Sequence, residues 1–140
     1  MSASKFTPAY FNEFSIGTLS GHLGIVITDI GERAVSAQFE VGPHLLAPNG
    51  YLHAGSVVTL ADTACGFGCI ANLPEGGNSF TTIELKSNHL GTAREGVVVC
   101  TAQLAHGGRT TQVWDAVVTN HSTGKTIAMF RCTQMILYPK

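Results

Sequence analysis

The sequence predicts an α+β fold in which one long helix is enclosed by a curved antiparallel sheet. The segment from Ala54 to about Leu73 is apolar on nearly every side and carries one carboxylate and no cation. A helix without a broad polar face must be buried on most sides. Four strand-like runs follow it and are joined by short turns, which favours an antiparallel meander. A long sheet curled around the helix buries it most economically.

The part before the helix is expected to hold a short helix and two strands. Residues 5–16 are predicted to form a helix or an arm with an aromatic side. Two strand-like runs, 24–28 and 34–41, are separated by a turn at 31–33. A loop with two prolines, residues 42–53, leads into the central helix.

After the helix, the pattern is β to the end of the chain. Proline and two glycines within 73–78 are strong stop signals for the helix. The strands are predicted at 80–88, 96–105, 110–119 and 126–137. The order is therefore αββ–α–ββββ. No linker or repeat is visible, so we expect residues 1–140 to form one domain, with 1–16 as an N-terminal helix or arm.

Composition limits the partners. Only 12% of residues are charged and 44% are hydrophobic, which suggests that another subunit covers part of the surface. The net charge of −1 gives no basic field for nucleic acid or an anionic membrane. No signal peptide or membrane span is visible, so a cytoplasmic protein is expected. Four local cations remain as candidate anion ligands: Lys86, Arg94, Arg109 and Arg131.

The four cysteines are expected to be small buried thiols in a reducing compartment. Each lies in an apolar segment, and the pair Cys65 and Cys69 shares one face of the helix. No neighbouring His or Cys completes a metal-binding set. The sequence therefore predicts no metal site.

Asp62 is the leading candidate for chemistry. It stands among apolar residues of the central helix, where an unpaired carboxylate costs several kcal/mol. Such a cost is often associated with a functional group. The alternative is a structural role, in which Asp62 caps a loop or pairs with a strand hydroxyl.

The start of the same helix is predicted to bind a carbonyl oxygen. Free N–H groups and a partial positive charge are found at a helix N-terminus. Ala54 and Gly55 stand there without bulky side chains, so a carbonyl can approach the backbone closely. His53 precedes them; it either fixes the start of the helix by bonding the loop backbone or polarises a bound substrate.

The spacing of these residues forms the most informative motif. Gly50 is followed by His53-Ala54-Gly55, and Asp62 stands nine residues after the histidine. In this order, these pieces resemble the hotdog-fold acyl-CoA thioesterases, in the branch with the phenylacetate-degradation and 4-hydroxybenzoyl-CoA thioesterases. The later segments that share the resemblance are Thr82–Leu85 with Asn88, Arg94–Gly96, and Gly108–Thr110 before Gln112-Val-Trp114.

The resemblance implies a hotdog fold that hydrolyses acyl-CoA thioesters without a cofactor. Asp62 would be the base or nucleophile, and Thr82, unless it is an ordinary strand residue, would hold water. Coenzyme A would be bound by Asn88, Arg94, Arg109 and Thr110, although the two arginines also suit solvated turns. Aryl or medium-chain acyl groups are implied, on CoA or on an acyl carrier protein. Candidates for lining the acyl pocket are Phe67, Phe80 and Leu90.

The chain departs from the family pattern at one position of the preceding loop. Six residues before the histidine, where the family usually has Asn or Gln, this chain has Ala47. The nearest amide side chain is Asn49. Either Asn49 takes over the task of orienting water or the thioester, or that group is missing.

Helix geometry predicts a shared site. Ala54 and Asp62 lie about 12 Å apart along the helix axis, so one carbonyl cannot touch both in the same chain. A two-fold dimer with antiparallel helices would bring Asp62 of one copy near Ala54 of the other. We therefore expect a homodimer or a dimer of dimers.

Two other functions fit parts of the sequence. A hotdog-fold hydratase or dehydratase would resemble a pattern with histidine five residues after the aspartate, where this chain has Phe67. A non-catalytic acyl-CoA-binding module would explain the fold and the arginines but leave Asp62 without a role.

Overall fold

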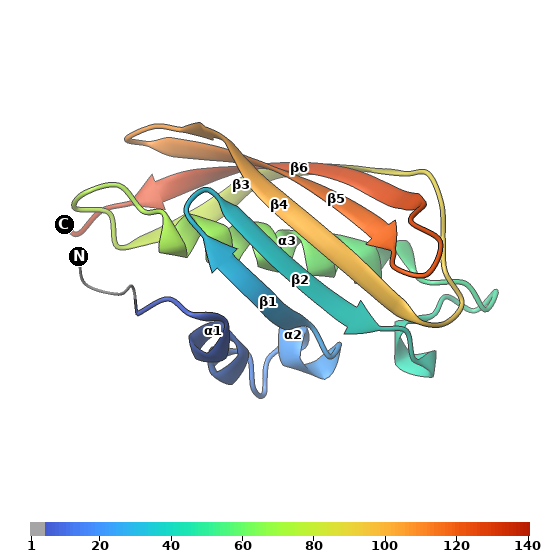
Figure 1. Ribbon diagram of the computed structural model, residues 1–140. Helices are drawn as coiled ribbons and strands as arrows, with labels where there is room; N and C mark the ends of the chain where they lie inside the picture. Colours follow the sequence, from blue (N-terminus) through green and yellow to red (C-terminus); the bar gives the residue numbers. More distant parts are fainter. Residues whose placement is uncertain (1–4) are drawn as a thin grey trace.

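A six-stranded antiparallel sheet wraps around one long helix, α3 (Ala54–Ala71), in the computed structural model, which describes residues 5–140 (Figure 1). The α+β fold class is confirmed. Along the sheet the strand order is β1-β2-β4-β5-β6-β3. The strands are β1 (Val26–Gly31), β2 (Ala34–Glu40), β3 (Ser79–His89), β4 (Val97–Gly107), β5 (Thr111–Asn120) and β6 (Thr126–Leu137).

The central helix is buried mainly by the sheet that curves around it. Leu60, Ala61 and Ala64 have no exposed surface, as expected for a helix without a polar face. Gly68 allows the closest approach, because a Cβ there would lie 2.6 Å from the Trp114 ring on β5. Although α3 has the length and hydropathy of a membrane span, it is the core helix of this fold.

The predicted meander of four strands is wrong in one connection. β4, β5 and β6 are neighbours in order, but β3 pairs with β6 rather than with β4. The segment between β3 and β4 returns past the start of α3, where the Leu52 N–H donates to the Ala93 carbonyl at 2.9 Å. β4 then pairs with β2. Strand periodicity identifies the buried face of a strand but not its neighbours.

Two short helices lie on the helix side of the sheet, beside β1 (Figure 1). α1 (Pro8–Phe14) packs Phe11 against Phe67 of α3, with ring centroids 4.3 Å apart. α2 (Leu19–His22) was not expected from the sequence; its Ser20 hydroxyl lies 2.9 Å from that of Thr63. A 3₁₀ turn, η1 (Pro43–Leu45), lies in the loop before α3.

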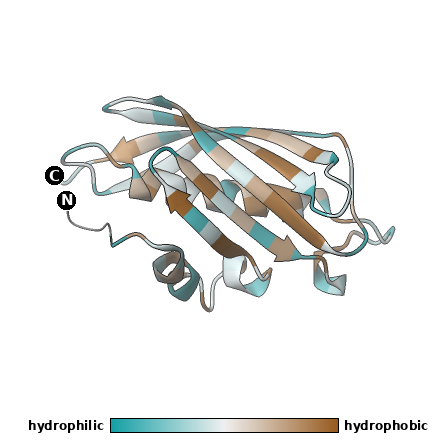
Figure 2. Ribbon diagram, viewed as in Figure 1, coloured by the Kyte–Doolittle hydropathy of each residue, from teal (hydrophilic) through white to brown (hydrophobic). Residues whose placement is uncertain are grey.

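Figure 2 shows the alternation of apolar and polar residues along the strands.

The two edges of the sheet differ. At the β1 edge, the Asn12 side chain accepts the Ile27 N–H at 2.7 Å and donates to the Ile27 carbonyl at 3.0 Å. At the other edge, no strand within residues 5–140 pairs with the outer side of β3. Ile83 and Leu85 of β3 are 53% and 41% exposed. A long, partly apolar edge strand is a surface on which another strand can pair.

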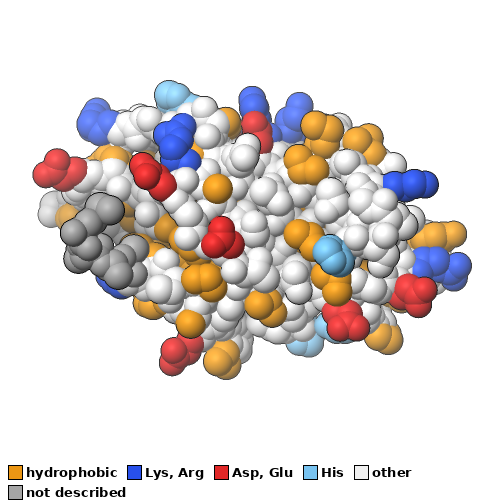
Figure 3. Space-filling model, in the orientation of Figure 1, with side chains coloured by type: hydrophobic (Ala, Val, Ile, Leu, Met, Phe, Trp, Pro, Cys, Tyr) orange, Lys and Arg blue, Asp and Glu red, His pale blue; other side chains and the backbone are white. Residues whose placement is uncertain are grey.

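On the face shown in Figure 3, charged side chains of both signs are scattered among hydrophobic ones. No large patch of a single charge is visible on this face.

Candidate functional site

The start of α3 is fixed by its own loop. His53 is the N-cap residue, and its Nδ1 atom accepts the Gly55 N–H at 2.7 Å. The buried Ser56 hydroxyl donates to the Leu45 carbonyl at 2.9 Å. The His53 N–H donates to the same carbonyl at 3.0 Å. The first turn is therefore held in place before any ligand binds.

Only one of the two predicted amide donors is free. The Gly55 N–H is occupied by His53, whereas the Ala54 N–H has no acceptor among residues 5–140. Both residues are exposed at the helix end. The Ala54 N–H, reinforced by the helix dipole, can therefore receive a negatively charged oxygen. Gly55 keeps the approach open because it lacks a side chain.

Substitution of His53 separates its two possible roles. His53→Ala is expected to lower the free energy of unfolding by about 1 kcal/mol, because the N-cap is lost. His53→Asn restores a side chain that favours this position, so it should recover stability in urea unfolding. If His53 acts only as a cap, the Asn variant also keeps the activity of the site. Loss of turnover in a fully stable Asn variant would instead place His53 on the substrate.

Asp62 lies half-buried on the side of α3 that faces β6 and β3. Its Oδ1 atom is buried and has no hydrogen-bond partner within the described part of the chain. Burial raises the pKa of the Asp62 carboxyl above its ordinary value. An unpaired carboxylate with a raised pKa is a stronger base than an ordinary aspartate.

The residues one helical turn after Asp62 contact the two strands β6 and β3. Cys65, one turn further on, lies beside the Cys132 thiol of β6, and this neighbour and burial raise the pKa of the Cys65 thiol well above its ordinary value. Gly66 lies against β3, because a Cβ there would lie 3.1 Å from the Phe80 ring. Asp62 is thus directed toward the seam between β6 and the open edge strand.

The four cysteines are free and buried, as expected. Burial raises the pKa of Cys69 and of Cys100 to about 12, so their thiols stay protonated. Among residues 5–140, no group of three or more His, Cys, Asp or Glu is arranged to hold a metal ion.

Thr82 lies on the same side of the sheet as Asp62. It pairs with Gln134, whose side chain is fully buried, so both face α3. A bulge at Ile83 follows, after which the alternation of inward and outward residues restarts. Thr81 points to the outer face, opposite the exposed Met135.

Asn49 is used by its own turn. Its Oδ1 atom accepts the Tyr51 N–H at 3.1 Å, and the residue is exposed. The Ala47 N–H donates to the Tyr51 carbonyl at 2.7 Å, which closes the loop. The structure therefore gives Asn49 a turn-forming role and leaves only its Nδ2 atom for another partner.

The two arginines predicted to bind CoA lie at opposite ends of α3. Arg94 lies over the Tyr51 ring, 4.9 Å from its centroid, beside the loop that leads into Ala54. Arg109 and Thr110 lie in the β4–β5 turn, near Asn72 at the helix C-terminus. The 18-residue helix is about 27 Å long, so the two arginines cannot hold one phosphate in a single chain.

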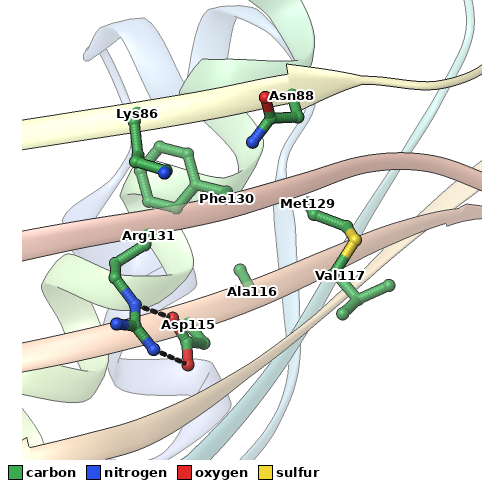
Figure 4. Close-up of a pocket in the computed structure, with 8 residues that line it drawn as sticks. All are labelled: Lys86, Asn88, Asp115, Ala116, Val117, Met129, Phe130 and Arg131. Carbon is green, nitrogen blue, oxygen red and sulfur yellow. Dashed lines mark hydrogen bonds and ion pairs between the residues drawn. The ribbon is translucent and has the colours of Figure 1, made fainter.

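Asn88 lies on the outer face of the sheet, away from α3. It lines a hollow of about 430 Å³ with Lys86, Met129 and the ion pair of Arg131 with Asp115 (Figure 4). The two hydrogen bonds of that pair are 2.5 and 2.8 Å long and lower the pKa of Asp115. The structure therefore separates Asn88 from the other predicted site residues.

The three residues predicted to line the acyl pocket lie in different parts of the structure. Phe80 lies on the Asp62 side of α3, whereas Phe67 packs on α1 and Leu90 is 64% exposed. Sequence reasoning missed the contact between Phe80 and Gly66. A glycine one helical turn after the candidate base was the signal that could have suggested a close approach there.

Comparison with known proteins gives consistent matches. Residues 49–127 match the thioesterase superfamily. A 1,4-dihydroxy-2-naphthoyl-CoA hydrolase from Listeria monocytogenes is 34% identical over 111 residues, which cover 79% of this chain and 89% of the relative. A thioesterase structure from Haemophilus influenzae has a TM-score of 0.89 at 29% identity and covers 96% of this chain and 93% of its own.

Two variant structures of one Staphylococcus aureus protein, a thioesterase, also match. Their TM-scores are 0.82 and 0.81 at 28% and 30% identity, and each covers 86% of this chain and at least 98% of its own. In the first, a glutamate is replaced by alanine, and in the second, a glutamine is replaced by alanine.

Proposed function

This chain belongs to the thioesterase superfamily and is a thioester hydrolase, and we propose that it hydrolyses aryl- or medium-chain acyl-CoA thioesters at a site shared between two copies. One observation carries the proposal: α3 holds a free N–H at Ala54 and an unpaired, half-buried carboxylate at Asp62, beside an open strand edge. The two groups are too far apart to serve one carbonyl within a chain.

The edge strand β3 supports the dimer. Pairing of two β3 strands would extend the sheet and place two α3 helices side by side. If these helices are antiparallel, the Ala54 N–H of one copy meets Asp62 of the other, and the arrangement occurs twice. The low charge of the surface favours such contacts, and a dimer of dimers would cover more of it.

The proposed reaction follows from these two groups. The carbonyl oxygen accepts the Ala54 N–H, which stabilises the negative charge as the carbonyl carbon becomes tetrahedral. Asp62 of the other copy takes a proton from water, and this water attacks the carbon; the CoA thiolate then leaves. Alternatively, the Asp62 carboxylate attacks directly, and water hydrolyses the resulting anhydride. Thr82, on the same side of the sheet, is a candidate to hold that water.

The variant structures support a catalytic role for Asp62 and concern the amide that is missing at Ala47. The glutamate and the glutamine replaced in the Staphylococcus aureus protein are separated by the same number of residues as Asp62 and Ala47 are here. An acid at the first position is retained in this chain, and an amide at the second is not. Asn49 could serve in place of that amide only through its Nδ2 atom, since its Oδ1 atom accepts the Tyr51 N–H.

A panel of acyl-CoA thioesters with a thiol reagent tests the proposal. We expect release of CoA from benzoyl-, naphthoyl- or medium-chain acyl-CoA without added metal or cofactor. The aryl substrates are favoured because the Listeria relative is a 1,4-dihydroxy-2-naphthoyl-CoA hydrolase. Tight binding without thiol release would indicate the non-catalytic module. Loss of an enoyl or hydroxyacyl absorbance without thiol release would indicate a hydratase or dehydratase.

Arg94 is proposed to bind a phosphate of CoA at the start of α3. Arg94→Ala is then expected to raise KM for an acyl-CoA by about tenfold, because a hydrogen bond to a charged group is lost. The same acyl group on N-acetylcysteamine, which has no phosphate, should show an unchanged KM. An equal change for both substrates would mean that Arg94 supports the loop through Tyr51 instead of binding CoA.

Arg109 and Thr110 of the partner copy would reach the same end of the site if the helices are antiparallel. Asn88, on the outer face, is proposed to contact CoA only at its periphery. We further propose that the substrate is free acyl-CoA in the cytoplasm, with acyl carrier protein thioesters as the alternative.

A further inference from the structure

We propose that Arg33 and Arg109 together form the binding site for the phosphorylated nucleotide of CoA. This inference rests on the proposed function but concerns a residue that neither the motif nor the comparisons single out. The two arginines come from different turns, β1–β2 and β4–β5, which are far apart in sequence. They line one hollow of about 410 Å³ at the C-terminal end of α3.

The backbone at Arg33 is held in an unusual conformation. Its φ of 67° makes Arg33 the only non-glycine residue within 5–140 with a positive φ. Glycine or asparagine adopts this conformation at lower cost. The Asn72 Oδ1 atom, at the end of α3, accepts the Arg33 N–H at 3.1 Å and holds the turn against the helix. Strain of this kind at the wall of a hollow suggests a function for the side chain.

Hydrogen bonds at the C-terminal end of α3 reduce the repulsion that its carbonyl groups would exert on an anion. The last carbonyls of a helix carry partial negative charge. Here the Asn72 side chain donates to the Gly68 carbonyl at 2.8 Å, and the Asn72 N–H donates to the Cys69 carbonyl. The buried Gln112 amide donates to the Asn72 carbonyl at 2.9 Å.

The charges that line this hollow favour an anion. Among the residues that line this hollow, Arg33 and Arg109 are the cations, and the exposed Glu32 is the one carboxylate. The Arg33 side chain makes one long contact, 3.5 Å from Nη2 to the Leu104 carbonyl, and Arg109 has no ion-pair partner within residues 5–140. Each guanidinium thus retains donors for a phosphate.

The position fits the proposed dimer. Antiparallel helices would place this hollow of one copy beside Arg94 and the Ala54 end of the other. The nucleotide would then be held between the two copies, while the thioester lies at Ala54 and Asp62. A carrier-protein substrate has no such nucleotide, so the hollow favours CoA.

Inhibition of acyl-CoA hydrolysis by adenosine 3′,5′-bisphosphate tests this site. We expect the wild-type enzyme to be inhibited, with adenosine, which lacks phosphate, as the inactive control. Arg33→Gly and Arg33→Asn, which both tolerate the positive φ, should each raise the inhibition constant by about tenfold. Their thermal unfolding should stay close to that of the wild type, because the Arg33 N–H bond to Asn72 is kept.

Three results would overturn the inference. One is unchanged inhibition in both variants, and another is a wild-type enzyme that hydrolyses acyl-CoA but is insensitive to the bisphosphate. The third is an equal rise of KM for the acyl-CoA and for its N-acetylcysteamine analogue, which would mean that Arg33 acts on the fold. Failure of the wild type to hydrolyse any thioester would contradict the proposed function itself.

Discussion

Asp62→Ala is expected to lower kcat by about 10²–10⁴-fold, the usual effect of removing a group that transfers a proton in the rate-limiting step. Asp62→Asn should be nearly as slow, because an amide cannot accept the proton or form the anhydride. Both variants should remain folded, since the Oδ1 atom makes no hydrogen bond within residues 5–140 that the fold would lose. Thiol release from the best acyl-CoA substrate measures the effect. An Asn variant with wild-type turnover would remove Asp62 from the reaction.

Asp62→Asn is also expected to stabilise the folded protein at neutral pH. Burial raises the folded pKa of Asp62 above its unfolded value of 3.8, so the folded state binds the proton more tightly. The stability of the wild type therefore falls as pH rises from the unfolded to the folded pKa. Asp62→Asn escapes this cost, so its melting temperature should exceed that of the wild type near pH 7. The difference should vanish in acid, below both pKa values.

The pH dependence of kcat/KM should be opposite to that of the stability, because catalysis needs the deprotonated form of Asp62. Only the deprotonated carboxylate can act as base or nucleophile, so kcat/KM should fall as pH decreases through the raised pKa of Asp62. The midpoint should lie above the ordinary value for aspartate. A pH profile that stays flat down to that ordinary value would show that another group performs this task.

Much of the fold could be predicted because one feature of the sequence allows few arrangements. An apolar helix that contains a single carboxylate must be enclosed, and strands joined by short turns can only enclose it as a sheet. The placement of β3 could not be predicted in the same way. The alternation of apolar and polar residues along β3 fits a position beside β4 as well as one beside β6. The choice between them depends on how the other strands pair in the folded sheet.

The candidate site residues could be proposed from the sequence, but the contacts that these residues make could not. Helix rise alone separates Ala54 from Asp62, so the proposal of a second copy could be made from the sequence. The cap formed by His53 on the Gly55 N–H depends on one side-chain rotamer, which no spacing specifies. The placement of Arg33 and Arg109 around one hollow depends on two hairpin turns that lie far apart in the chain.

The central claim is that Ala54 of one copy and Asp62 of another serve the same carbonyl. Ala54→Pro removes the proposed N–H donor at the first position of the helix, where proline is well tolerated. The preceding residue, His53, already has the extended conformation that proline requires, with φ of −68° and ψ of 136°. The variant is therefore expected to fold and to lose most activity. Ala54→Gly, which keeps the N–H, is the matched control and should remain active.

Subunit exchange between inactive Asp62→Ala and inactive Ala54→Pro tests this claim most directly. Each mixed dimer would hold one site with both groups intact and one with neither, so an equal mixture should recover about one quarter of wild-type activity. Exchange is verified by mass spectrometry of differently tagged copies, and folding by circular dichroism. If mixed dimers form and activity stays at the level of the parent variants, then Ala54 and Asp62 do not act on one carbonyl, and the shared site is wrong.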